Sequence, residues 1–99
     1  MEYEIETTNE FDKWLSNQEK SVISRIKARI FRVSNGNFGD YKQISDDIFE
    51  LRFFFGSAYR IYYTFKDDKI VVLLTGGIKS SQSKDIKKTS KLLQELNYD

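Results

Sequence analysis

Residues 48–65 read IFELRFFFGSAYRIYYTF, and this stretch decides the fold. Apolar and polar side chains alternate along each half of it, which predicts two strands, over residues 48–55 and 58–65, joined by a short turn. Successive side chains of a strand point to opposite faces, so Arg52 and Arg60 share the face opposite the apolar one. We therefore expect the two arginines to lie side by side on neighbouring antiparallel strands.

The segments on either side extend this hairpin into a larger sheet. Residues 41–44 and 70–75 also have strand character, which predicts a four-strand antiparallel meander. Residues 70–75 read IVVLLT, as expected for a strand covered on both faces. The other expected elements are a strand over residues 2–6, helices over residues 9–15 and 18–34, and a last helix from near residue 81 or 83 to 96. The sequence thus predicts one α+β domain over residues 1–99: an N-terminal strand, a two-helix hairpin, a four-strand meander and a C-terminal helix, with the helices mainly on one face.

The two expected N-terminal helices are amphipathic. Asn9 is in a position to cap the first helix, with Asp12 three residues on. In the second helix the apolar residues trace one face; they are Val22, Ile23, Ile26, Ile30 and Val33. Basic residues fill the rest of that helix: Lys20, Arg25, Lys27, Arg29 and Arg32.

Composition excludes several classes of chemistry. The chain has 99 residues and neither cysteine nor histidine, so disulfides, the usual zinc sites and histidine acid–base catalysis are excluded. Chemistry must come from Lys, Arg, Tyr, Asp, Glu or Ser, and no cofactor or metal is expected. No apolar run reaches the roughly 18–20 residues that span a bilayer, and the N-terminus lacks the pattern of a signal peptide. A soluble cytoplasmic protein without a membrane partner is the expectation.

Charge is segregated along the chain although the net charge is only +1. Residues 1–19 carry six acids against one lysine, whereas residues 20–42 carry six basic residues against one acid. Residues 79–91 hold five lysines against one acid. Such blocks form patches that can meet a polyanion or a charged protein, and the alternative is that the helices simply have solvated charged faces.

A set of cations around a tyrosine is the candidate site. Arg52 and Arg60 can converge on a phosphate, which a guanidinium binds through two parallel hydrogen bonds. Tyr62, expected to be exposed on the same face, offers a stacking surface and a hydroxyl. Lys79, after the buried strand, and Lys84, in the first turn of the last helix, close the site from the side.

Structural explanations compete with this site. Arg52 pairs with Glu50 or Asp47 in one alternative, and Arg60 pairs with Asp67 in another. The acidic pairs at residues 46–47 and 67–68 are typical of turns rather than metal sites.

Two other features are ambiguous. Gly76-Gly77 resembles a phosphate loop only superficially, because the GxxxxGK[ST] spacing is missing. Phe54 must leave the core face, and it then stacks on a base, contacts a partner or lies beneath the last helix, the last being the commonest arrangement.

Four strings in order resemble the RelE/ParE superfamily of toxins from type II toxin–antitoxin systems, particularly its phage-related HigB-like branch. They are Gly36-Asn37-x-Gly39-Asp40, Glu50-Leu51-Arg52, Tyr59-Arg60-Ile61-Tyr62-Tyr63 and Leu73-Leu74-x-Gly76-Gly77-x-Lys79-x-x-Gln82-x-x-Asp85-Ile86. The resemblance spans roughly residues 3–96 and implies a RelE-like fold. It also implies a toxin that cleaves messenger RNA on the ribosome. The implied partner is a cognate HigA-like helix-turn-helix antitoxin, in a complex that can be a heterotetramer.

The resemblance also assigns residues. The family's arginine in the Tyr-Arg strand falls on Arg60, the basic residue of the preceding strand on Arg52, and the one after the central strand on Lys79. Four further residues are predicted to contact RNA: Lys42, Phe54, Gln82 and Lys87. The chain departs from the family where lysines are replaced by Ile48 and Glu50, and where a tyrosine of the last helix is replaced by Asp85-Ile86.

The implied reaction is metal-independent attack of a ribose 2′-hydroxyl on the adjacent phosphate, which inhibits translation. Arg52 and Arg60 stabilise the phosphorane, and Lys79, Lys84 or Tyr62 manages protons. One alternative is a ParE-like inhibitor of DNA gyrase, which Glu50 and the missing tyrosine favour. Another is a non-catalytic binding module for RNA or protein.

Overall fold

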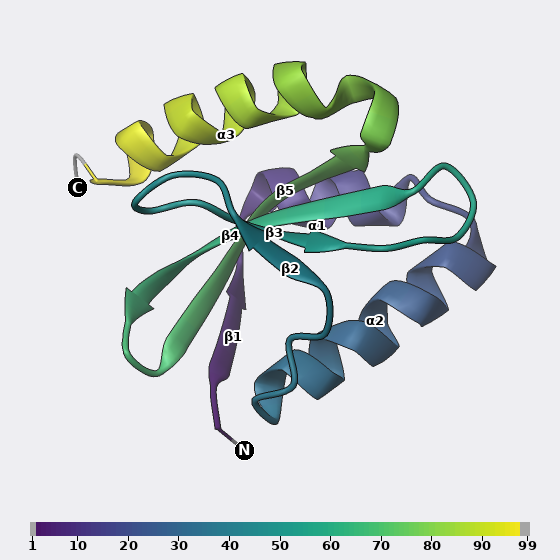
Figure 1. Ribbon diagram of the computed structural model, residues 1–99, viewed down its shortest axis with the longest axis horizontal. Helices are drawn as coiled ribbons and strands as arrows, with labels where there is room; N and C mark the ends of the chain where they lie inside the picture. Colours follow the sequence, from purple (N-terminus) through teal and green to yellow (C-terminus); the bar gives the residue numbers. More distant parts are fainter. Residues whose placement is uncertain (1, 98–99) are drawn as a thin grey trace.

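The computed structural model describes residues 2–97 and has the expected α+β architecture (Figure 1). In chain order its elements are β1 (Glu4–Thr7), α1 (Asn9–Ser16), α2 (Lys20–Ser34), β2 (Tyr41–Gln43), β3 (Phe49–Arg52), β4 (Tyr59–Asp67), β5 (Ile70–Ile78), the 3-10 turn η1 (Lys79–Ser81) and α3 (Gln82–Asn97). The sequence therefore predicts every strand and α-helix in the correct order, but not the 3-10 turn.

The five strands form one sheet in the order β1-β5-β4-β3-β2. Strands β2 to β5 are the expected antiparallel meander. Strand β1 pairs with β5 in parallel, so β5 lies inside the sheet and not at its edge. In the register of β3 and β4, Arg52 lies opposite Arg60, as the alternation predicts. Arg60 in turn lies opposite Gly77 of β5.

The helices divide between the two faces of the sheet (Figure 1). Helices α1 and α2 cover one face, where the main core lies, and its most buried members include Phe11, Ile26, Leu51, Ile61 and Leu73. Helix α3 covers the opposite face (Figure 1). The expectation that the helices lie mainly on one face holds for α1 and α2 but not for α3. The reason is that buried side chains of the sheet outside the core cluster, including Tyr62 and Leu74, need their own cover.

The N-cap of helix α1 lies one residue earlier than expected. Its N-cap is Thr8, whose hydroxyl oxygen accepts a hydrogen bond from the backbone N–H of Phe11 at 3.0 Å. The same hydroxyl donates to the carbonyl oxygen of Leu74 in β5 at 2.6 Å. Thr8 displaces Asn9 as the cap because its hydroxyl makes both bonds, one within the helix and one to the sheet.

Candidate functional site

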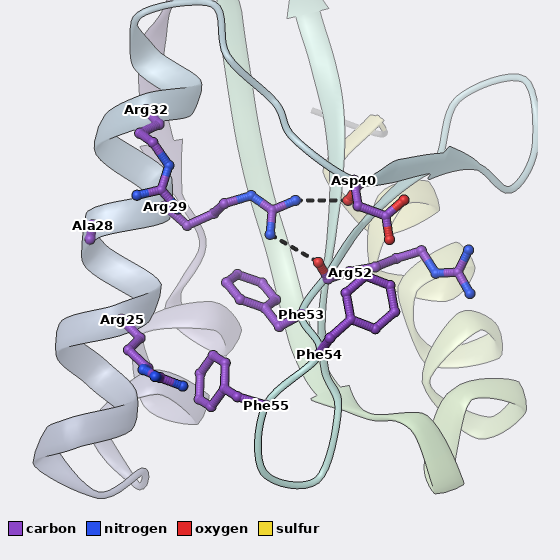
Figure 2. Close-up of a pocket in the computed structure, with 9 residues that line it drawn as sticks. All are labelled: Arg25, Ala28, Arg29, Arg32, Asp40, Arg52, Phe53, Phe54 and Phe55. Carbon is purple, nitrogen blue, oxygen red and sulfur yellow. Dashed lines mark hydrogen bonds between the residues drawn. The ribbon is translucent and has the colours of Figure 1, made fainter.

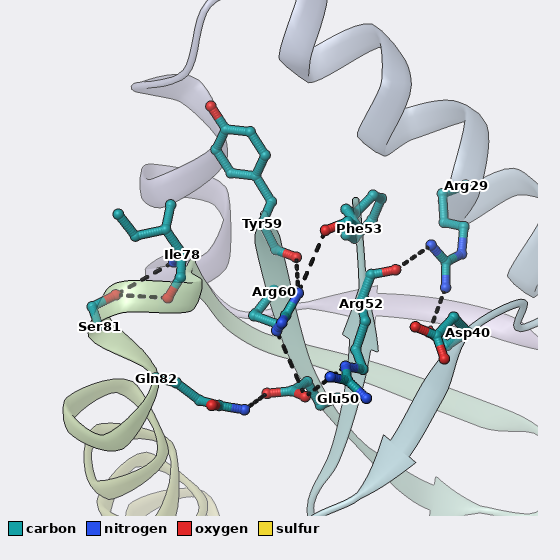
Figure 3. Close-up of polar contacts among 10 residues, drawn as sticks. All are labelled: Arg29, Asp40, Glu50, Arg52, Phe53, Tyr59, Arg60, Ile78, Ser81 and Gln82. Atoms are coloured by element: carbon teal, nitrogen blue, oxygen red, sulfur yellow. Dashed lines mark hydrogen bonds and ion pairs between the residues drawn. The ribbon is translucent and has the colours of Figure 1, made fainter. Parts of the chain in front are cut away.

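A buried carboxylate, Glu50 of β3, organises the face of the sheet under the first turn of α3 (Figure 3). Its Oε1 atom lies 3.7 Å from Nε of Arg52 and 3.8 Å from Nε of Arg60. Its Oε2 atom accepts a hydrogen bond from Nε2 of Gln82 in α3 at 2.7 Å. One carboxylate therefore ties both arginines of the expected site to the last helix.

Arg60 is on the expected face but is not open to solvent. Only 2% of it is exposed, and its Nη1 donates weakly to the carbonyl oxygens of Tyr59 at 3.3 Å and Phe53 at 3.4 Å. The alternative pairing with Asp67 is wrong, because Arg60 pairs with Glu50 and the Asp67 carboxylate accepts from the backbone N–H of Lys69 in a turn. Arg60 can thus act on a ligand only through the groups above it.

Arg52 is the accessible guanidinium of the pair. Its side chain is 34% exposed, against 2% for Arg60. The structural alternative, a pairing of Arg52 with Glu50, is confirmed. Since the pairing leaves a third of the side chain in solvent, Arg52 can contact a bound anion while it remains paired with Glu50.

Tyr62 is fully buried, so the expectation of an exposed ring is wrong. Burial, reinforced by the neighbouring Glu50 and Asp85 carboxylates, raises the pKa of the Tyr62 hydroxyl above its usual value despite the opposing charge of Arg60. Its hydroxyl has no hydrogen-bond partner of good geometry within the described residues. Tyr62 therefore stays protonated and out of reach of a substrate.

Four lysines of the expected site are exposed: Lys42, Lys79, Lys84 and Lys87. Lys42 of β2 lies opposite Glu50 in the register and so shares its face of the sheet. Lys79 lies in η1, and its backbone N–H donates a hydrogen bond to the carbonyl oxygen of Ala58 at 3.0 Å. None of the four forms an ion pair with another residue in the range 2–97.

The two uncharged candidates have different surroundings. Gln82 donates its side-chain amide to Glu50, so it braces the site from α3. Phe54 is 76% exposed. The expectation that it lies beneath the last helix, the commonest of the three arrangements, is therefore wrong. Phe54 lines a cavity of about 340 Å³ between residues 25–32 of α2 and residues 52–55, which we call the α2 cavity (Figure 2).

The two glycines at the end of β5 permit close packing rather than phosphate binding. A Cβ atom at Gly77 would collide with the carboxylate of Asp85, which accepts a hydrogen bond from the Ser81 hydroxyl. A Cβ atom at Gly76 would collide with the ring of Trp14. Asp85, a departure from the superfamily pattern, therefore anchors the start of α3 against the sheet.

Sequence reasoning missed Arg29, which is not on the exposed side of α2 but is only 8% exposed. Its guanidinium donates to the carbonyl oxygens of Phe38, Asp40 and Arg52 at 2.7–3.1 Å. Burial, with Arg32 nearby, lowers the pKa of Arg29, and Asp40 opposes this. Its spacing from Val22, Ile26 and Val33 places it on their helix face, a signal that could have identified it.

Comparison with known proteins identifies the family. The model of the family described as Phage derived protein Gp49-like matches residues 13–96. The chain belongs to this family. The Gp49-like chain is also 47% identical over 97 residues to an uncharacterized protein of Haemophilus influenzae, a match that covers 97% of this chain and 98% of the relative.

Solved RelE structures share the fold of the Gp49-like chain. The isolated RelE toxin of E. coli has a TM-score of 0.65 and 18% identity, over 87% of this chain and 97% of that one. The intact E. coli RelBE toxin–antitoxin complex gives a TM-score of 0.61 and 17% identity, over 77% and 95%. The RelB-RelE antitoxin–toxin complex of Methanococcus jannaschii gives 0.62 and 21%, over 80% and 95%. Family and fold confirm the resemblance to the RelE/ParE superfamily.

The site of this Gp49-like chain is suited to holding an anion. One accessible guanidinium pairs with a buried carboxylate, a second pairs with the same carboxylate from a buried position, and the exposed Lys42 lies opposite that carboxylate on β2. Within residues 2–97, none of the helices combines the length and apolar character needed to cross a bilayer.

Proposed function

We propose that the protein is the toxin of a type II toxin–antitoxin pair and that it inhibits translation in the cytoplasm by cleaving messenger RNA on the ribosome. In this proposal it is an endoribonuclease that needs no metal ion. Membership of the Gp49-like family and the RelE fold support the toxin role. The observation that carries the RNA-directed activity is the Arg52 guanidinium, which pairs with Glu50 while a third of the side chain remains in solvent.

The arrangement of charges suits attack of a ribose 2′-hydroxyl on the adjacent phosphate. The 2′-oxygen bonds to phosphorus as its proton passes to water, and the bond to the 5′-oxygen breaks. Lys79 or Lys84 then gives a proton to the departing 5′-oxygen. Arg52 binds the phosphoryl oxygens, where charge accumulates in the transition state.

The remaining residues have supporting roles in this proposal. Arg60 adds positive charge from beneath Glu50, and Gln82 braces that carboxylate from α3. Lys42 and Lys87 bind neighbouring phosphates. Tyr62 is withdrawn from proton transfer, because its hydroxyl is buried and burial raises its pKa.

The partner that we propose is a HigA-like antitoxin with a helix-turn-helix domain, which can form a heterotetramer with this chain. The RelE chains of the E. coli and M. jannaschii complexes are paired with antitoxins, which supports a protein inhibitor here. Co-expression of the adjacent reading frame would relieve growth arrest if it encodes this antitoxin.

The proposed activity is tested by inducing the chain in bacteria and mapping transcript ends. We expect growth arrest together with new 5′-hydroxyl ends within translated codons. Arg52→Ala should lower the cleavage rate by about 10²- to 10³-fold, the usual cost of one transition-state contact. Lys66→Ala is the matched control, because Lys66 is an exposed cation that pairs with Glu6 of β1. Arrest without new transcript ends would overturn the proposed activity.

One observation favours a second function, inhibition of DNA gyrase in the manner of ParE toxins. Glu50 neutralises one of the two guanidinium groups, and the second is almost fully buried. A site with a single accessible guanidinium is weaker for catalysis than for binding a protein. Loss of plasmid supercoiling after induction, with intact transcripts, would select this alternative.

A further inference from the structure

The α2 cavity lies beside the proposed site and is lined mostly by cationic and aromatic side chains (Figure 2). Arg25 and Arg32 line it from α2, while Arg52 and Phe54 line it from the end of β3 and the segment that follows, with the Arg52 guanidinium directed away from α2 (Figure 2). Its volume of about 340 Å³ falls within the range of ligand sites, about 300–1,000 Å³. The cavity is therefore large enough to hold a nucleotide-sized group.

Buried positive charge lies at the base of the cavity. Arg29 lines it and donates its N–H groups to backbone carbonyls, not to carboxylates. Within residues 2–97 it forms no ion pair, and the nearby Asp40 carboxylate offsets its charge only from a distance. Four arginines against one carboxylate give the cavity a positive balance, which favours an anionic occupant.

The aromatic wall is also unusual. Phe54 is 76% exposed, although neighbouring Phe53 is buried in the core and Phe55 has Arg25 stacked over its ring at 4.3 Å. An exposed phenylalanine beside guanidinium groups offers the stacking surface that unpaired bases use. Since the flanking rings are already engaged, Phe54 is the ring left for a ligand.

We infer that the α2 cavity is the subsite for the nucleotide next to the cleaved phosphate in a single-stranded RNA. The inference rests on the proposed ribonuclease function, because Arg52 lines both the cavity and the proposed site. Arg25 and Arg32 bind flanking phosphates, and Phe54 stacks on the base. The carboxylate of Asp40, also on the cavity wall, accepts a hydrogen bond from a base amino group.

An acidic peptide is the competing occupant. It would satisfy the arginines but would meet the Asp40 carboxylate with like charge, whereas a base brings hydrogen-bond donors to the same place. The mixed lining of cations, one acid and one exposed ring therefore favours RNA.

Binding of a six-nucleotide RNA tests the inference. The RNA carries 2′-O-methyl groups throughout, so it cannot be cleaved, and its affinity for the full chain is measured by fluorescence anisotropy at several salt concentrations. Phe54→Ala should weaken binding about 5- to 150-fold, the usual effect of losing one stacked base, with an unchanged salt slope. Arg25→Ala/Arg32→Ala should reduce that slope by about 1.4, because each phosphate contact to a single strand contributes about 0.7.

The matched control is Lys20→Ala/Lys27→Ala, which removes the same charge from α2 at exposed positions that do not line the α2 cavity. We expect it to leave the salt slope as in the parent. An equal fall of the slope in both double variants would reveal diffuse attraction and overturn the subsite. So would parent-like affinity of Phe54→Ala, failure of the parent to bind the RNA, or tighter binding of a polyglutamate peptide. Transcript cleavage after induction would still stand in each case, so the subsite can fail while the proposed function survives.

Discussion

Two buried arginines, one on each face of the sheet, are held in opposite ways. Arg29, on the α2 face, donates four hydrogen bonds of 2.7–3.1 Å to backbone carbonyls and stacks over Phe53 at 4.7 Å. Arg60, on the α3 face, has one carboxylate at 3.8 Å and two weak bonds to carbonyls at 3.3 and 3.4 Å. Its Nε atom has no hydrogen-bond partner of good geometry among the described residues.

The difference separates a buried cation whose hydrogen bonds are all made from one whose hydrogen bonds are weak or missing. Native proteins satisfy nearly all buried polar groups, and the exceptions concentrate where function sets the geometry. Four such atoms lie together on the α3 face: Glu50 Oε1, Arg52 Nε, Arg60 Nε and Tyr62 Oη. The polar groups of Arg29 on the α2 face are therefore fully hydrogen-bonded, while the polar network around Glu50 on the α3 face is only partly satisfied and reaches solvent through Arg52.

The largest expected effect is on the α2 face. Arg29→Ala removes the bonds that join α2 to the backbone of Phe38, Asp40 and Arg52, and it should lower the free energy of unfolding by about 3–5 kcal/mol. Urea unfolding measures this loss. Lys27→Ala, an exposed neighbour on the same helix, should change stability by no more than about 0.5 kcal/mol. Equal urea midpoints of unfolding for the two variants would show that Arg29 does not stabilise the fold.

The second largest effect is expected at Arg60, where a second substitution should restore the stability that the first one removes. Arg60→Met leaves Glu50 with less compensation and should cost about 3 kcal/mol, as breaking a buried ion pair does. Adding Glu50→Leu should restore stability to within about 1 kcal/mol of the parent, since a buried pair can be replaced by apolar groups at little cost. A double-mutant cycle by urea unfolding gives the coupling. No such rescue is expected for Arg29, which forms no ion pair in the described chain. Purely additive losses of stability at Glu50 and Arg60 would contradict their pairing.

Alternation along residues 48–65 was sufficient to predict the hairpin and the pairing of Arg52 with Arg60. Those features are local, because they depend only on the two-residue period of a strand. Burial of Arg60 and Tyr62 could not be obtained in this way. It depends on α3 packing across their face of the sheet. The helix is distant in the sequence from these strands, so its packing leaves no periodic pattern in them.

Arg29 and Glu50 show two kinds of missed information. Arg29 was predictable from its four-, three- and four-residue spacing with Val22, Ile26 and Val33, but its charge argued for exposure. The sequence marks Glu50 as a departure from the superfamily pattern and as a pairing candidate for Arg52. That it also contacts Arg60 and Gln82 follows only from the three-dimensional convergence of β3, β4 and α3.

Adjacent glycines of β5 sharpen the contrast between the faces. Gly76→Ala would drive a methyl group into the ring of Trp14, which cannot easily move, and should cost about 2 kcal/mol. Gly77→Ala meets the end of a flexible side chain, Asp85, and should cost under about 1 kcal/mol. Trp14 is the only tryptophan, so its fluorescence should change in the first variant and not in the second. A larger loss at Gly77 would indicate that the start of α3 is as rigid as the core.

The smallest effect at neutral pH is expected for Tyr62→Phe. The hydroxyl that it removes is buried without a partner of good geometry in the described chain, so stability at pH 7 should change by less than about 1 kcal/mol. Growth arrest should persist, because a tyrosine that stays protonated in the folded protein does not transfer protons.

Alkaline pH should separate this variant from the parent. Burial raises the pKa of both Tyr62 and Tyr63 in the folded chain above their usual value of 10. Above pH 10 the unfolded chain therefore releases tyrosine protons that the folded chain keeps, and stability falls as the pH rises, by at most about 1.4 kcal/mol per pH unit for each tyrosine. Tyr62→Phe removes one of these two contributions, and Tyr63→Phe, on the α2 face, removes the other. Urea unfolding at pH 8 to 11 should therefore give both variants a shallower decline than the parent, whereas an unchanged decline in Tyr62→Phe would mean that its hydroxyl is hydrated and open to substrate after all.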